Sequence, residues 1–183
     1  MVIVTTPMCK KILEFAGVKN FKINKNPDNE KGDLAILLSE SKVKMNSLAI
    51  KLNTFDQIKE SIIKVSKYSE NGKINDGQIK EIFSNYPVAK EWLYPTKEIE
   101  SLKLKNSKIS VKVYSKFLKD IVEDMNFNIN NQDPDYIIFP DYLKKTIIEK
   151  DESKFVEIPT HKNISKDPIK RGEIRYRLLE KLY

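Results

Sequence analysis

The sequence places its only three arginines close together near the end of the chain. They are Arg171, Arg175 and Arg177; since the chain has 33 basic residues, 33 minus 3 leaves 30 lysines. A guanidinium differs from an ammonium because its planar fork donates two parallel hydrogen bonds to a carboxylate or a phosphate. Arg171 and Arg175 are four residues apart and share one face of the helix predicted there. The cluster therefore predicts either an anion-binding site or ion pairs that dock this helix onto the protein.

Hydroxyl, thiol and ammonium groups follow the first predicted strand of each half of the chain. In open α/β sheets, ligands bind at the carboxyl ends of parallel strands, beside the free N–H groups of helix N-termini. We therefore predict an anionic ligand between two such N-termini, with the arginines as clamps. The predicted ligand-binding residues are Thr5, Thr6, Cys9, Ser115, Lys116, Arg171 and Arg175.

Two weaker candidates for catalysis are Cys9 and Asp141. A helix N-terminus lowers the pKa of a thiol and makes it more nucleophilic, although the favoured interpretation of Cys9 is a small buried apolar residue. Pro140-Asp141 followed by Glu152-Ser153-Lys154 fits the loose PD…ExK pattern of metal-dependent nucleases. In that pattern two carboxylates hold a cation and the lysine positions a water. The pattern is short and Glu152 reads as part of a turn, so we predict no metal site.

Other motifs are missing from the sequence. It has neither G-x-G-x-x-G nor a Walker A loop, and its only histidine, His161, reads as an ordinary surface residue. The motifs identify no family, and they leave the cofactor unknown.

The elements that would position these groups occur twice. Each half has an apolar strand, a helix, a turn-rich segment ending in aspartate, and a second apolar strand. The tetrad F-x-I-N and a Pro-Asp pair recur within the turn-rich segments. The corresponding parts are strands 2–4 and 111–113, helices from Thr6 and from Ser115, segments 21–33 and 127–135, and strands 34–38 and 136–139.

This pattern predicts an α/β fold with a mostly parallel sheet, built from two similar strand-helix-strand units. A helical middle segment broken by Pro87 and Pro95 joins them, and a helix from Asp167-Pro168 ends the chain. The predicted division is residues 1–70, 71–106 and 107–183, as two small lobes or as one compact domain.

The composition of the chain says less about its class than the motifs do. The net charge is +7 and the pI about 9.2, but the basic residues are lysines mixed with glutamates, as in many proteins of AT-rich or thermophilic organisms. The longest apolar run, residues 34–38, is too short to cross a bilayer, so no membrane partner is predicted. The single cysteine and the absence of signal-peptide features at the start predict a cytoplasmic protein.

The sequence does not reveal a reaction. The best hypothesis is an α/β module that binds an anionic small molecule bearing a phosphate or a carboxylate. One alternative is a nucleic-acid-binding protein that uses its basic surface and the arginine-bearing last helix. Another is an enzyme, either a metal-dependent nuclease or a cysteine-dependent one. The oligomeric state stays open.

Overall fold

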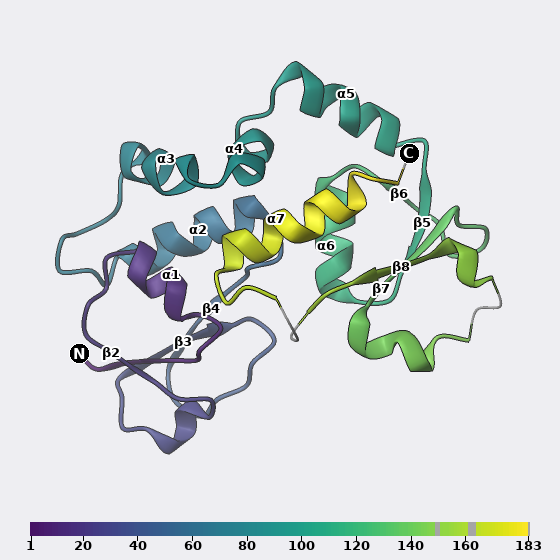
Figure 1. The fold of residues 1–183 in the computed structure, drawn as a ribbon. Coiled ribbons are helices and arrows are strands. Elements are labelled where there is room, and N and C mark those ends of the chain that lie inside the picture. Colours follow the sequence, from purple (N-terminus) through teal and green to yellow (C-terminus); the bar gives the residue numbers. More distant parts are fainter. Residues whose placement is uncertain (149–150, 161–163, 183) are drawn as a thin grey trace. The chain divides into compact units, whose positions relative to one another are not determined.

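The computed structural model describes residues 1–148, 151–160 and 164–182. The chain splits into two compact units, one formed by residues 1–87 with 166–170 and the other by 88–165 with 171–183. Each unit contains a parallel four-stranded sheet with helices beside it, as Figure 1 shows. The predicted α/β class is confirmed. The division into residues 1–70, 71–106 and 107–183 stays a prediction.

The sheet of unit 1 has the strand order β2-β1-β3-β4, and its neighbouring strands are all parallel. Its core is apolar because Ile12, Leu13, Ile58 and Ile62 of the adjoining helices α1 and α2 are fully buried. The elements are β1 (Ile3–Thr5), α1 (Lys10–Phe15), β2 (Phe21–Ile23), the 3-10 turn η1 (Pro27–Asn29), β3 (Leu34–Leu38), β4 (Ser47–Ile50), α2 (Phe55–Ser66) and α3 (Asp76–Ser84).

The sheet of unit 2 repeats this order as β6-β5-β7-β8, again with parallel neighbours. In unit 2, Trp92 contacts the C-terminal helix of the chain: its indole Nε1 donates to Glu180 over 3.0 Å, and its ring packs edge-on to Tyr176. The elements are α4 (Pro87–Leu93), α5 (Lys97–Asn106), β5 (Ser110–Val113), α6 (Lys116–Asp124), β6 (Asn128–Ile129), β7 (Tyr136–Pro140), the 3-10 turns η2 (Asp141–Thr146) and η3 (Glu152–Lys154), β8 (Phe155–Ile158) and α7 (Pro168–Leu179), of which Arg171 onward belongs to unit 2.

The two units agree even in single hydrogen bonds. Asp33 Oδ2 accepts from the N–H of Val2 over 2.6 Å, and Asp135 Oδ2 accepts from the N–H of Ser110 over 2.7 Å. In each case an aspartate just before the third strand of the unit accepts a hydrogen bond from the backbone at the start of the first strand. Two similar strand-helix-strand units were predicted, and this prediction is confirmed.

The shared F-x-I-N tetrad does not mark equivalent positions, however. When Asp33 is aligned with Asp135, Ile3 corresponds to Val111, because these residues pair with the residue after each aspartate. Ile3 pairs with Phe21, whereas Val111 pairs with Ile129. The two tetrads are therefore two residues out of register, and it is the strand order and the aspartate bridges that relate the units.

Two helices differ from their predicted extents. The helix expected from Thr6 begins at Lys10, because a turn comes first in which the carbonyl of Thr6 accepts from the N–H groups of Cys9 and Lys10. The sequence of residues 141–150 also predicts a helix, but the structure has the 3-10 turn η2 (Asp141–Thr146) in the part of that range that it describes. No helix among the described residues is long and apolar enough to cross a membrane.

Candidate functional site

Arg175 is a buried cation at the carboxyl edge of the unit 2 sheet. Its side chain is 6% exposed, its Nε–H donates to the carbonyl of Pro159 over 3.3 Å, and its guanidinium lies 4.8 Å from the centre of the Phe117 ring. Pro159 directly follows β8, and Phe117 lies in the first turn of α6. The sequence thus brings three elements together around one guanidinium.

The two terminal nitrogens of Arg175, Nη1 and Nη2, donate none of the hydrogen bonds found for this residue. Within the described part of the chain no carboxylate lies within ion-pair distance of this guanidinium, and no acceptor receives a hydrogen bond from Nη1 or Nη2. Asn106 Oδ1 is the one buried side-chain polar atom without a partner among these residues. Nη1 and Nη2 of Arg175 are not among such atoms.

The surroundings of Arg175 disfavour its charge. The pKa of Arg175 is lowered to about 9, chiefly by burial and secondly by the nearby charge of Arg171, while Asp141 acts in the opposite direction. At neutral pH the guanidinium is still protonated, so the fold holds a positive charge that its own groups compensate only in part. A buried charge without a partner is unfavourable, and an anion bound beside it relieves that cost.

Unit 1 provides an internal comparison for Arg175. Strand pairing aligns Ile50 with Ile158 at the ends of β4 and β8, so Lys51 corresponds to Pro159. In unit 1 the carbonyl of Lys51 accepts from the hydroxyl of Ser61, on α2, over 2.8 Å. Ser61 is therefore the counterpart of Arg175, and a serine can make the bond that joins helix to sheet. The hydrogen bond to the Pro159 carbonyl needs one donor, so the N–H groups on Nη1 and Nη2 of Arg175 are not required for it.

The other two arginines of the cluster differ in their surroundings. Arg171 is 3% exposed and donates from Nη1 to the carbonyl of Ser165 over 3.4 Å, and it has further interactions. Arg177 is exposed on the same helix. The two arginines predicted to share a face do so as buried residues, and they do not form a basic surface patch.

Ser115 and Lys116 lie at the same edge of the unit 2 sheet, directly before Phe117. Ser115 caps α6, because its hydroxyl accepts from the N–H of Leu118 over 3.3 Å, and Lys116 is exposed. Both residues line a hollow of about 330 Å³ together with Lys119 and Asn131. The hollow carries two ammonium groups and the N-terminus of a nine-residue helix.

The unit 1 candidates are engaged in the fold. Thr5 and Cys9 are fully buried, and the Thr5 hydroxyl donates to the carbonyl of Ile36 over 2.8 Å. Thr6 is half-buried, and its carbonyl forms the turn before α1. Their role in binding stays a prediction.

Asp141 is occupied by hydrogen bonds. Its Oδ1 accepts from the N–H of Tyr142 and from the hydroxyl of Thr160, and its Oδ2 accepts from the Thr160 N–H. Glu152 is exposed on η3, and Lys154 donates to the carbonyl of Pro134. No group of three His, Cys, Asp or Glu side chains that could hold a metal ion occurs in residues 1–148, 151–160 and 164–182. His161 lies outside the described residues.

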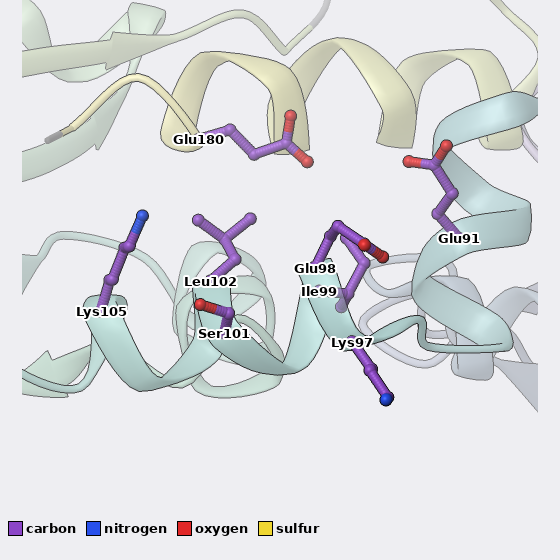
Figure 2. A pocket seen from close by; sticks show the side chains of 8 residues that line it. All are labelled: Glu91, Lys97, Glu98, Ile99, Ser101, Leu102, Lys105 and Glu180. Carbon is purple, nitrogen blue, oxygen red and sulfur yellow. The ribbon is translucent and has the colours of Figure 1, made fainter.

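A groove of about 500 Å³ lies elsewhere in unit 2, between α4, α5 and the residue that follows α7 (Figure 2). The carboxylates of Glu91 and Glu180 face the same space, whereas Lys97 points away from it. Glu180 already accepts from Trp92, and the hydrogen bond from Thr96 holds the pKa of exposed Glu98 below its usual value. None of the residues predicted for the site lines this groove.

The sequence could not reveal Phe117, Pro159 or Thr160 as parts of the site. Each contacts Arg175 or Asp141 only through the register of the sheet and the path of α7. The signal that the sequence did contain was the choice of arginine in a chain that otherwise uses lysine.

The chain shares its α/β fold with a solved structure. The crystal structure of the periplasmic vitamin B12 binding protein BtuF of Vibrio cholerae is similar to this chain, with a TM-score of 0.55 and 10% sequence identity. The similarity covers 99% of this chain and 94% of the other. No family model matches the sequence, and no curated protein matches it either.

The comparison contradicts the predicted cytoplasmic location. The solved protein that shares the fold is a periplasmic one. The prediction relied on a single cysteine and on the residues at the start of the chain. Neither determines the compartment, because a protein with a sufficient hydrophobic core needs no disulfide to be stable outside the cytoplasm.

Proposed function

We propose that this chain is a binding module for an anionic small molecule, which it holds at the carboxyl edge of the unit 2 sheet. The observation that carries the proposal is Arg175, a buried guanidinium with spare donors and no carboxylate partner among the described residues. Arg171 adds a second positive charge, and Ser115 and Lys116 flank Phe117 at the start of α6. The phosphate or carboxylate of the ligand would accept from the Arg175 fork.

The fold supports a binding role in general terms. The similar solved structure is that of a protein named for binding vitamin B12, a small molecule. Parallel α/β sheets bind ligands at the carboxyl ends of their strands, which is the edge where Arg175, Asp141 and Thr160 lie.

The alternatives draw less support from the site. A nucleic-acid backbone would need exposed cations, and of the arginines on α7 Arg171 and Arg175 are buried, which leaves Arg177 as the exposed one. The nuclease hypothesis would need Asp141 and Glu152 to share a cation, and Asp141 accepts hydrogen bonds from Thr160 and Tyr142 instead.

Thermal unfolding of the full chain tests the proposal. The melting temperature is measured with benzoate or inorganic phosphate against sodium chloride at the same ionic strength. An anion at about 100 times its Kd should add ~2.7 kcal/mol to the free energy of unfolding and raise the melting temperature by roughly 5–10 °C. Arg175→Gln should remove this rise, and Arg177→Gln, on the exposed side of the same helix, should keep it. Equal rises in both variants would contradict the proposal.

A further inference from the structure

The connection from α2 to α3, residues 67–75, contains the pair Asn71-Gly72 (Figure 1). Asn71 is the only asparagine in the chain that is followed by glycine. The side-chain amide of an asparagine is lost when the backbone nitrogen of the next residue attacks Cγ and closes a five-membered succinimide ring. A side chain on that next residue hinders the attack, and glycine has none. The pair therefore has the composition that most favours deamidation.

The structure leaves the reacting groups of this pair accessible. Both residues are exposed, and a Cβ atom added to Gly72 would meet nothing within 4 Å beyond its two chain neighbours. The side-chain amide of Asn71 makes no hydrogen bond with a described residue, since the bond found for Asn71 is the one that its backbone N–H donates to Ser69 Oγ over 3.2 Å. No such contact holds Cγ of Asn71 away from the nitrogen of Gly72.

One hydrogen bond has to open before the attack. The Gly72 N–H donates to the carbonyl of Ser69 over 3.1 Å and closes a β-turn in which Asn71 is the third residue. This bond lies in an exposed loop, and such bonds open at the low end of a protein's range of local stabilities. The turn should therefore slow the reaction relative to an unstructured peptide but not prevent it.

Two further hydrogen bonds hold the ends of the loop to the body of unit 1. The Ser69 hydroxyl donates to the carbonyl of Gly17 over 2.9 Å, and the N–H of Ile74 donates to Ser66 Oγ over 3.0 Å. Residues 70–73 lie between these two anchors, and all four are exposed. An isoaspartate at position 71 would add one methylene to the backbone of this stretch, which should accommodate it without a change in the core.

The other asparagines are less well placed for the reaction. Each is followed by a residue with a side chain. Some also have their amides held in the fold: Asn75 caps α3 with its side chain, and the Asn106 amide is buried and donates to a backbone carbonyl. Asn71 alone combines an exposed position with a following glycine.

From these observations we propose that Asn71 is a site of spontaneous deamidation in the native protein. The nitrogen of Gly72 forms a bond to Cγ of Asn71, and the amide nitrogen leaves as ammonia with the proton that Gly72 gives up. Water then opens the succinimide at either of its two carbonyls, which yields aspartate or isoaspartate and a new carboxylate next to Glu70 in the chain. No oxidant, reductant or enzyme takes part. The site belongs to unit 1 and does not depend on the binding site proposed in unit 2.

Timed incubation of the full chain, followed by pepsin digestion at acidic pH and peptide mass spectrometry, tests this proposal. We expect Asn71 to deamidate at pH 7 several-fold faster than any other asparagine, with aspartate and isoaspartate products resolved as separate peaks. The rate should rise at least about tenfold from pH 7 to pH 9, because the attacking nitrogen must give up its proton to base. Asn71→Gln should remove the reaction, since glutamine has to close a larger ring.

Gly72→Ala tests the role of the glycine and should slow the reaction several-fold. Gly72 has a φ of 76°, which alanine adopts at a cost, so circular dichroism and the melting temperature establish that this variant folds. Faster deamidation of another asparagine, or an unchanged rate in a folded Gly72→Ala variant, would overturn the proposal. Deamidation of Asn71 in urea but not in the native chain would also overturn it, because the turn would then protect the pair.

The stability of the deamidated chain tests how the loop accommodates the product. Its melting temperature should stay within about 2 °C of that of the original chain, because the change is confined to residues 70–73. A larger fall would contradict the inference that this stretch absorbs the additional methylene.

Discussion

Replacing Arg175 with methionine should make the protein more stable while it abolishes anion binding. The pKa of Arg175 is lowered to about 9 from an ordinary value of 12.5, mainly by burial, so the folded state disfavours the charged form by ~5 kcal/mol. At pH 7 the guanidinium is protonated both folded and unfolded, and the whole of this cost acts against folding. Methionine keeps a flexible apolar stem in the same space and brings no charge.

The exchange also loses favourable contacts. The hydrogen bond from Nε to Pro159 contributes ~1 kcal/mol, and the contact with the Phe117 ring contributes roughly 0.5–2 kcal/mol. The net gain should be about 2–3.5 kcal/mol, a size seen when buried ions give way to apolar residues. For a chain of this length the melting temperature should rise by roughly 3–10 °C.

Urea unfolding at pH 7 and thermal melting both measure this gain. Arg177→Met is the matched control, because Arg177 is exposed on the same helix, and it should change the free energy of unfolding by no more than about 0.5 kcal/mol. A loss of stability of more than about 1 kcal/mol in Arg175→Met would refute the reasoning. It would mean that Arg175 docks α7 onto the sheet, as the other interpretation of the arginine cluster holds.

Three further predictions concern single groups. Benzoate affinity should be constant from about pH 6 to 8 and fall as the pH rises through about 9, because Arg175 then loses its proton; a decline delayed to about pH 10.5 would point to lysines instead. Hydrogen bonds from the N–H and then the hydroxyl of Ser110 lower the pKa of Asp135, so its contribution to stability is present above about pH 4 and is lost as the pH falls through the lowered pKa. Asp135→Asn should therefore flatten the acid limb of the stability curve measured by urea unfolding, and Asp133→Asn in the same loop should not. Cys9 is fully buried, so iodoacetamide should modify it only after unfolding; rapid alkylation of the native chain, followed by mass spectrometry, would revive its role as a nucleophile.

Local signals in the sequence were enough to predict much of the fold. Thr54 and Gln57 have the spacing of a capping box, which predicts a helix start, and α2 begins there with the Thr54 hydroxyl accepting from the Gln57 N–H. Ser115 caps α6 in the same way, and Asp167 accepts from two N–H groups at the start of α7. Such caps join residues only two or three positions apart, so they are readable without knowledge of the tertiary structure.

Of the proposed site, only the arginines were open to prediction. Their type stood out against the lysine bias, but the features on which the proposed role of Arg175 depends are long-range: Phe117 lies on another helix, and Pro159 follows a strand in the sheet. The equivalence of Ser61 and Arg175 depends on the register of β4 and β8, since the sequences of α2 and α7 do not match. The F-x-I-N tetrad gave a wrong alignment of the two units, because its two copies lie two residues out of register in the sheets.

The repeated unit separates what the fold requires from what it only tolerates. In both units an aspartate, Asp33 or Asp135, accepts a hydrogen bond from the backbone at the start of the first strand. This hydrogen bond is therefore part of the architecture. Both join the helix that follows the last strand to the carbonyl directly after that strand, but one uses the small hydroxyl of Ser61 and the other the guanidinium of Arg175. Since the architecture needs one donor at that point, the additional donors and the buried charge of Arg175 work against stability. The proposed binding role accounts for donors and a buried charge that the architecture does not need.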